Sequence, residues 1–157
     1  QLQRARSYAD IGFPSRYFVR RSYLLNHLYW RFPHPDEMSD YHGYLHQCYA
    51  SEDVMDLHRA HLDSIADYAD SLGIPFAAVV FPFLEDLEGS RFAVDPILSH
   101  YRERGIPCLD VGAILAGQKA ESLVVNLNDA HPNAYVHTLV ADSLYALLQR
   151  EGYIEAP

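Results

Sequence analysis

Residues 73–81 read Gly-Ile-Pro-Phe-Ala-Ala-Val-Val-Phe, and this stretch decides the fold class. The glycine can end a helix in a left-handed conformation, and the proline leads the chain into a continuous apolar run. A short run that is apolar at every position is typical of a strand covered on both faces, as in a parallel sheet. The sequence therefore predicts a buried strand over residues 76–81.

The same turn recurs one helix later. Residues 105–111 read Gly-Ile-Pro-Cys-Leu-Asp-Val and follow a helical pattern over residues 95–104. Residues 53–72, which precede the first turn, predict another helix, with Ser51 or Asp53 as its cap. Its apolar positions recur near helical spacing, and its Asp63, Asp67 and Asp70 predict a solvated face; the apolar positions are Val54, Leu57, Ile65, Tyr68 and Leu72. Helices that alternate with strands indicate successive βαβ units.

The remaining segments complete an α/β pattern. A third strand is predicted over residues 123–125, and a final helix from about residue 131 to residue 150. In the first part of the chain, residues 20–30 predict a helix and residues 33–50 a loop or short helix. Three strands are few for such a sheet and would leave an exposed edge. Strands are therefore hidden in the N-terminal part, supplied by oligomerisation, or missing.

Length and charge limit the function classes. The chain has 157 residues, 49% of them hydrophobic, which fits one domain with a sizeable core. We expect a single α/β domain over 1–157, in which 1–50 form an aromatic-rich helical or loop part and 51–157 a βαβ-type core. The net charge of −9 argues against a general nucleic-acid or anionic-membrane binder. The longest apolar stretch, residues 74–84, is too short for a membrane span.

The charge is unevenly spread along the chain. Residues 1–50 hold six arginines and four acids, for +2, whereas residues 51–157 hold six bases and 17 acids, for −11. An arginine and aromatic mixture like that of the first part can bind single-stranded nucleic acid. Because the whole chain is acidic, we favour a helix that packs on the domain with its arginines in water.

Two polar segments leave the predicted strands where an open α/β sheet binds its ligands, beyond the carboxyl ends. Pro82 begins the segment after the first strand, and Asp110 closes the second. After the third strand, Asp129 stands two residues before His131. A histidine that acts as a general base needs one ring nitrogen held by an acceptor and the other free for the nucleophile. Asp129 and Asp110 are the two candidates for that acceptor.

The segment around His131 also carries a family resemblance. Residues 128–133 read Asn-Asp-Ala-His-Pro-Asn, and the terminal helix that follows carries His137, Ala141 and Leu144. This block resembles the last block of the SGNH (GDSL-type) hydrolase family, in which the catalytic aspartate and histidine lie just before the final helix. The resemblance covers about residues 70–150. It implies a three-layer, flavodoxin-like (SGNH-hydrolase-like) parallel sheet.

The resemblance also implies roles for individual residues. Asp129 would orient His131, and His131 would be the base that activates a serine, with no cofactor and no metal. Asn133, Asp110 and Pro82 are candidate supporting or substrate-binding residues. The substrate class is an acyl or acetyl ester of a small molecule or a carbohydrate. The sequence does not assign a cellular compartment.

The nucleophile of that family is not found in these 157 residues. No serine follows Gly-Asp, no Gly-x-Asn-Asp block is present, and there is no Gly-x-Ser-x-Gly elbow. The strands expected in the first half are missing as well. We therefore expect the C-terminal portion of a longer hydrolase, without its N-terminal strands, and the start at Gln1 rather than Met agrees. A partner chain or an N-terminal half would supply the serine and the oxyanion donors.

Other functions remain open. Relatives with the same Asp-x-His spacing transfer acyl or acetyl groups, so an O-acyltransferase is the nearest alternative. A non-catalytic binding module that lost the nucleophile is another. A metal-binding domain is a third, based on histidine pairs at metal-ligand spacing: His42 and His46, and His58 and His61 near Asp56. Two cysteines are too few for a disulfide framework or a four-cysteine zinc site, and we expect Cys48 and Cys108 to be small buried side chains.

Overall fold

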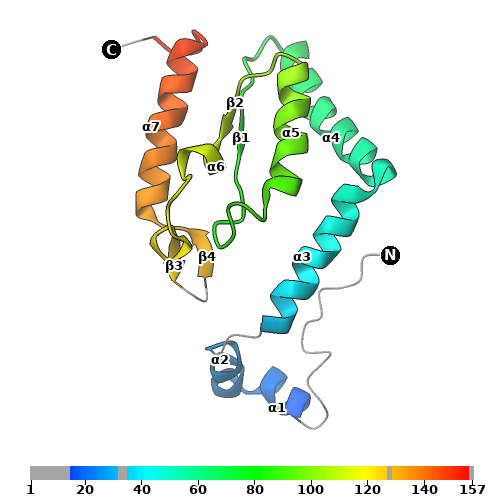
Figure 1. The fold of residues 1–157 in the computed structure, drawn as a ribbon, viewed down its shortest axis with the longest axis vertical. Helices are drawn as coiled ribbons and strands as arrows, with labels where there is room; N and C mark the ends of the chain where they lie inside the picture. Colours follow the sequence, from blue (N-terminus) through cyan, green and yellow to red (C-terminus); the bar gives the residue numbers. More distant parts are fainter. Residues whose placement is uncertain (1–14, 32–34, 127–128, 156–157) are drawn as a thin grey trace. The chain divides into compact units, whose positions relative to one another are not determined.

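The computed structural model describes residues 15–31, 35–126 and 129–155 (Figure 1). The chain divides into two compact units, residues 1–45 and residues 46–157. The dividing point lies within the third helix.

The first unit is helical where it is described. It contains α1 (Ser15–Arg21), α2 (Tyr23–Arg31) and the beginning of α3 (Pro35–Ala50). The helix predicted over residues 20–30 is therefore confirmed, with an interruption between α1 and α2. The prediction of a loop or short helix over residues 33–50 is wrong. Proline is tolerated in the first turn of a helix, and one internal glycine costs only about 1 kcal/mol, so neither residue type prevents α3.

The second unit alternates helices and strands, as predicted. Its strands β1 (Ala78–Val80) and β2 (Cys108–Asp110) pair in parallel, with Val79 opposite Leu109. The other elements are α4 (Glu52–Ser71), α5 (Arg91–Glu103), α6 (Val111–Ile114), a 3-10 turn η1 (Ala120–Ser122), β3 (Val124–Asn126), β4 (Asp129–Pro132) and α7 (Ala134–Arg150). The two Gly-Ile-Pro turns form as the sequence predicts, because Gly73 and Gly105 adopt φ of 65° and 68°.

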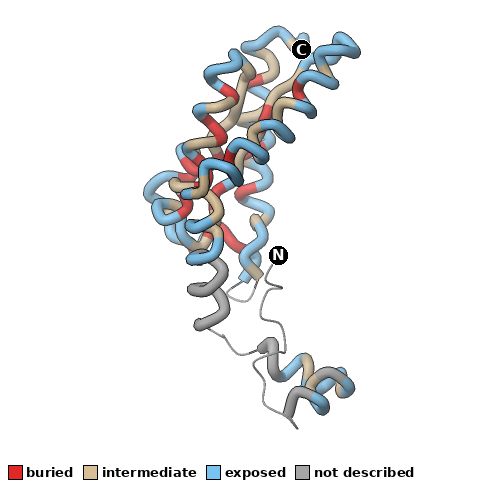
Figure 2. The backbone as a smooth tube through the Cα atoms, turned by 90° about the vertical axis from the view of Figure 1, so that its right-hand side faces the viewer, coloured by how far each residue is buried: buried red, intermediate tan, exposed pale blue. Residues whose placement is uncertain are grey.

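The parallel strands are covered on both faces. Val79 and Leu109 pack into one core, which includes residues of α6 and α7. Ala78, Val80 and Cys108 pack into a second core, which includes residues of α4 and α5. Figure 1 shows α4 and α5 on one side of the strands and α7 on the other, and Figure 2 shows buried residues on several of these elements. The protein is therefore of mixed α/β class, with a short parallel sheet of two strands among its described residues.

The third predicted strand forms, but it does not join the parallel sheet. β3 pairs in an antiparallel manner with β4, with Val124 opposite Pro132 and Asn126 opposite Asp129. Only two residues separate Asn126 from Asp129, and a connection this short favours a hairpin. The segment that carries Asp129 and His131 is therefore a strand of a hairpin, and the final helix predicted from about residue 131 begins only at Ala134.

The helix predicted over residues 53–72 is confirmed as α4, but its periodic apolar side chains do not face the core. All five that mark the helix in the sequence are exposed: Val54 43%, Leu57 60%, Ile65 56%, Tyr68 68% and Leu72 55%. The buried side chains of α4 are Met55 and Ala66. Ser51 is the N-cap, although its side chain makes no capping hydrogen bond.

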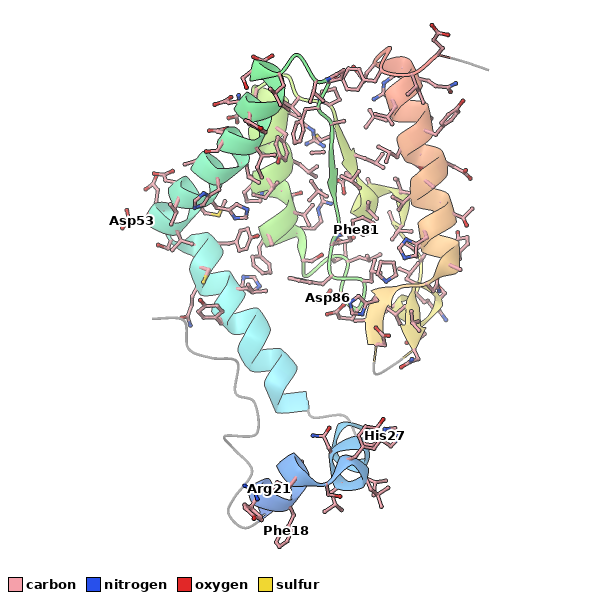
Figure 3. The ribbon with its side chains drawn as sticks, turned by 180° about the vertical axis from the view of Figure 1, so that it is seen from behind. Phe18, Arg21, His27, Asp53, Phe81 and Asp86 are labelled. Carbon is pink, nitrogen blue, oxygen red and sulfur yellow. The ribbon has the colours of Figure 1, made fainter. Side chains whose placement is uncertain are left out.

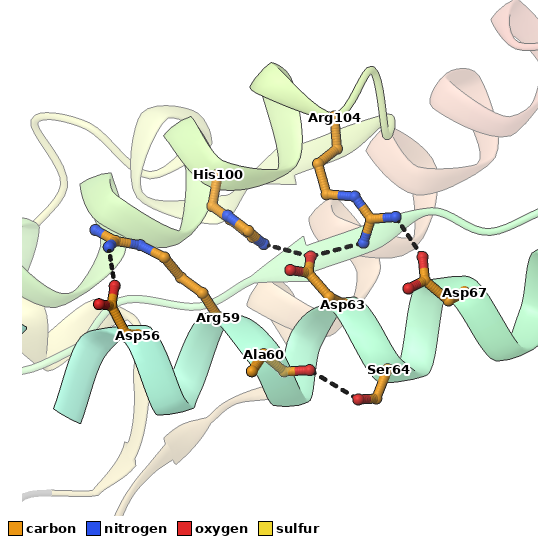
Figure 4. A network of polar contacts seen from close by, with 8 residues as sticks. All are labelled: Asp56, Arg59, Ala60, Asp63, Ser64, Asp67, His100 and Arg104. Atoms are coloured by element: carbon orange, nitrogen blue, oxygen red, sulfur yellow. Dashed lines mark hydrogen bonds and ion pairs between the residues drawn. The ribbon is translucent and has the colours of Figure 1, made fainter. Parts of the chain in front are cut away.

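A polar network joins α4 to α5 (Figure 4). Asp63 Oδ1 lies 2.7 Å from His100 Nε2 and accepts a hydrogen bond of 2.6 Å from Arg104. Arg104 also donates to Asp67 at 2.5 Å. Asp67 and Asp70 are exposed, as the sequence predicts for this face, whereas Asp63 is only partly exposed. Both Asp63 and Asp67 pair with Arg104, which the helical pattern alone does not predict.

The polar network makes the stability of the folded protein depend on pH through Asp63. Burial raises the pKa of Asp63, but hydrogen bonds from His100 and Arg104 outweigh it, and the pKa lies below its ordinary value of 3.8. A carboxyl with a lowered pKa stabilises the folded state above its unfolded pKa, and this contribution is lost as the pH falls through the folded pKa.

We expect Asp63→Asn to lower the melting temperature by a few degrees at neutral pH and to flatten the loss of stability below about pH 4. Asp70→Asn, which changes another acid of α4, is the matched control and should change neither. Thermal unfolding followed by circular dichroism across pH measures both effects. Identical profiles for the two variants would contradict the role of the network.

Candidate active site at the carboxyl ends of the strands

The β3–β4 hairpin lies at the end of the second unit where β1 and β2 end (Figures 1 and 3). Leu84, from the loop that leaves β1, packs in one core with Val124 of the hairpin and Val136 of α7. Asp86 lies on the same loop near this end of the unit (Figure 3). The segment that carries Asp129 and His131 is therefore positioned where open α/β sheets bind ligands.

Asp129 and His131 are in direct contact. Asp129 Oδ1 lies 2.5 Å from His131 Nδ1 and also accepts a hydrogen bond of 3.1 Å from the backbone N–H of His131. The His131 side chain is 86% exposed. The hydrogen bond from the His131 ring, followed by that from its backbone, lowers the pKa of Asp129 below 3.8. Asp129 is thus a carboxylate at neutral pH, and it fixes the proton of a neutral His131 ring on Nδ1.

Asn133 attaches the hairpin to α7. Its side-chain oxygen accepts from the N–H of Val136 at 3.1 Å, which caps the helix. Its side-chain nitrogen donates to the carbonyl of Ser122 at 2.8 Å and, more weakly, to that of Val124 at 3.4 Å. Its backbone N–H donates to Leu123 at 2.9 Å. One side chain therefore fixes the strand that carries His131 to the helix that follows it.

Asp110 has a different set of partners. It lies 3.0 Å and 3.1 Å from Arg91 Nη1 through its two oxygens, and it caps α6 by accepting from the N–H of Ala113. Its side chain is only 12% exposed. Arg91 pairs with Asp95 as well. Of the two acids that the sequence offers as a partner for His131, Asp129 is the one in contact.

Pro82 lies with the Arg91–Asp110 ion pair around Gly112. It is buried, and a Cβ at Gly112 would lie 3.6 Å from Pro82 Cγ, 3.0 Å from Arg91 Nη1 and 3.2 Å from Asp110 Oδ1. The glycine therefore permits a close approach that any side chain would oppose. Pro82 and Asp110 thus belong to the packed cluster around Gly112, whereas Asp129 and His131 lie on the hairpin.

The Asp129–His131 pair can accept a proton but lacks a nucleophile within the described residues. Two serines near the hairpin and the first loop use their hydroxyls locally: Ser122 donates to the carbonyl of Lys119, and Ser90 to that of Leu87. In residues 15–31, 35–126 and 129–155, no serine hydroxyl is hydrogen-bonded to His131. Among the described residues, the arrangement thus pairs an exposed imidazole with one carboxylate.

Among the described residues, the histidines considered for a metal do not converge. His46 stacks on Phe92 with ring centroids 3.5 Å apart, and His58 lies edge-on to Tyr49. The side chain of His42 lies outside the described residues. Among the described residues, no three or more His, Cys, Asp or Glu side chains are grouped as metal ligands. Cys48 and Cys108 are free thiols of intermediate burial.

Arg91 is the residue at this end that sequence reasoning missed. It begins α5 and pairs with an acid 19 positions later in the chain. Short motifs do not connect residues this far apart. The available signal was indirect: an arginine that starts the helix after one strand faces the carboxyl end of the next parallel strand.

Comparison of the chain with protein-family models, with curated proteins and with solved structures finds no match.

We expect Asn133→Ala to lower the free energy of unfolding by about 1–2 kcal/mol, because the helix cap and two side-chain hydrogen bonds are lost. Asn133→Ser keeps a capping oxygen but not the donors to Ser122 and Val124, so its loss should be smaller. Urea unfolding measures both. A serine variant as unstable as the alanine variant would show that the cap contributes nothing.

The contact with Asp129 fixes the ring tautomer of His131, which nitrogen NMR can observe. We expect the neutral ring to carry its proton on Nδ1, and we expect Asp129→Ala to shift the population toward the other tautomer. Because the pKa of Asp129 is lowered, its contact should persist as the pH falls to about 4 and disappear only below. An unchanged tautomer in Asp129→Ala would refute the orienting role.

Proposed function

We propose that this chain supplies the histidine and aspartate of an SGNH-type serine ester hydrolase, acting on acyl or acetyl esters. The observation that carries the proposal is the 2.5 Å contact between Asp129 and His131, on a ring that is 86% exposed. The contact occupies Nδ1, and no described residue is hydrogen-bonded to Nε2. That is the arrangement a general base requires.

Each residue has a defined part in the proposed reaction. His131 Nε2 takes the proton from a serine hydroxyl as the oxygen attacks the ester carbonyl, and then returns it to the leaving alcohol. Asp129 holds the ring in orientation and stabilises the imidazolium that forms. In the second half of the reaction, water attacks the acyl-enzyme and His131 again moves the proton. Asn133 keeps the hairpin against α7, while Pro82 and Asp110 lie with Arg91 around Gly112 at the carboxyl ends of the strands.

The serine and the oxyanion donors belong, in this proposal, to polypeptide outside these 157 residues or to a partner chain. The finer fold is then a three-layer flavodoxin-like parallel sheet, of which β1 and β2 are two strands. Two observations support this. The strands have cores on both faces, as strands of such a sheet do, and the hairpin lies beyond their carboxyl ends. Transfer of the acyl group to another hydroxyl instead of water uses the same residues and is the neighbouring activity.

The test is fluorophosphonate labelling and p-nitrophenyl acetate hydrolysis by the complete gene product that contains this chain. We expect His131→Ala to abolish labelling and Asp129→Ala to lower kcat by about 10²–10⁴-fold. His61→Ala, which removes an exposed histidine of α4, is the matched control and should retain full activity.

Two outcomes would overturn the proposal. Full activity in Asp129→Ala, with none in Asp110→Ala, would move the orienting role to the other acid. A folded, complete gene product that neither labels nor hydrolyses would identify a non-catalytic binding module. Labelling of the isolated 157 residues that disappears in His131→Ala would keep the histidine as the base but place the nucleophile among the serines of this chain.

A further inference from the structure

The segment that contains α1 and α2 is the basic part of an acidic chain. Residues 11–35 hold four arginines and no acid, for a net charge of +4, not counting histidine. Residues 36–157 hold six bases and 20 acids, for −14. The whole-chain charge of −9 therefore conceals a local cationic segment, and the surface that this segment presents has to be considered by itself.

That surface is also apolar. Six large apolar side chains of α1 and α2 are exposed: Tyr17 47%, Phe18 55%, Tyr23 90%, Leu24 64%, Leu25 40% and Leu28 41%. None of them belongs to the two apolar cores that the described residues form. Exposed aliphatic and aromatic side chains at this density within one short segment mark an interaction surface rather than scattered surface residues.

The two helices form one nearly continuous element. Ser22 lies between them, and its N–H donates to the carbonyl of Phe18 while its own carbonyl accepts from Asn26, both at 2.9 Å. The hydroxyl of Ser22 also accepts from the N–H of Leu25. These three hydrogen bonds link α1 to α2 across Ser22.

Charge and aromatic surface occur side by side on α1. The guanidinium of Arg21 lies 4.6 Å from the centroid of the Tyr17 ring and donates to the Tyr17 hydroxyl at 3.0 Å. Phe18 packs edge-on against Tyr17, with 5.7 Å between the ring centroids. Figure 3 shows Phe18 and Arg21 projecting from α1. A cation, an amphipathic tyrosine and an apolar ring thus share one small area.

We propose that the α1–α2 segment binds the surface of an anionic lipid bilayer. The three exposed leucines and Phe18 enter the boundary between headgroups and acyl chains, Tyr17 and Tyr23 lie at headgroup level, and Arg21 contacts a lipid phosphate. This is binding in the plane of the membrane. Among the described helices, none combines the length and the apolar character that crossing a bilayer requires.

The aliphatic side chains favour lipid over single-stranded nucleic acid. Nucleic-acid surfaces of this kind use aromatic rings on which bases stack, together with cations that follow the phosphates. Leu24, Leu25 and Leu28 have no ring for a base to stack on, whereas each adds to burial in a bilayer interface. Half of the exposed apolar side chains of the segment would thus contribute to lipid binding alone.

The experiment is sedimentation of the full 157-residue chain with vesicles. We expect binding to equimolar phosphatidylcholine and phosphatidylglycerol, none to phosphatidylcholine alone, and weakening as salt is raised. Arg21→Glu and Leu24→Glu should each lower the partition coefficient by roughly tenfold or more, one by losing charge attraction and the other by losing apolar burial.

Leu57→Glu is the matched control, because Leu57 is 60% exposed on α4, in the acidic part of the chain. We expect it to bind as the unmodified chain does. Equal binding to both vesicle types, no binding to either, or an equal loss in Leu57→Glu would overturn the proposal. So would tight binding of an oligothymidylate that Arg21→Glu abolishes and Leu24→Glu leaves intact, because the partner would then be nucleic acid. Should Leu24→Glu lose helicity, the charge reversal at Arg21 decides.

Discussion

The parallel pairing of β1 with β2 requires apolar cover on both faces of the strands. Successive side chains of a strand point to opposite sides, so Val79 enters one core while Ala78 and Val80 enter the other. Each core needs its own helices, and the chain supplies α4 and α5 for one face and α7 for the other. Because α7 has to begin where the strands end, the hairpin before it is held at the carboxyl ends of the sheet.

The acids near the strand ends are distinguished by their partners. Asp110 pairs with Arg91 and accepts a hydrogen bond from a backbone N–H of α6, and its side chain is largely buried. Asp129 has neither contact, and its carboxylate instead contacts the ring and the backbone N–H of His131. Two carboxylates that look equivalent in the sequence thus have separate tasks. One stabilises the end of the sheet, and the other sets the protonation geometry of an exposed imidazole.

The sequence predicts features that depend on neighbouring residues and misses those that depend on distant ones. The turns at Gly73 and Gly105 follow from a local conformational requirement, and the nearness of Asp129 to His131 follows from a spacing of two. The Arg91–Asp110 pair leaves only an indirect signal in the sequence, because its members meet only after the chain has crossed between strands. The apolar spacing of α4 correctly predicts a helix, yet Leu57 and its periodic neighbours are exposed, because periodicity reveals a helix without revealing which face is buried.

The order in which these contacts can form follows from their separation along the chain. The β3–β4 hairpin closes a very short loop, so the Asp129–His131 contact can form on the timescale of local structure. Pairing of Ala78 with Cys108 must wait until α5 has crossed between the two strands. The Asp129–His131 contact can therefore be assembled in a chain whose parallel sheet is still incomplete, whereas the pairing of β1 with β2 is among the last parts to form.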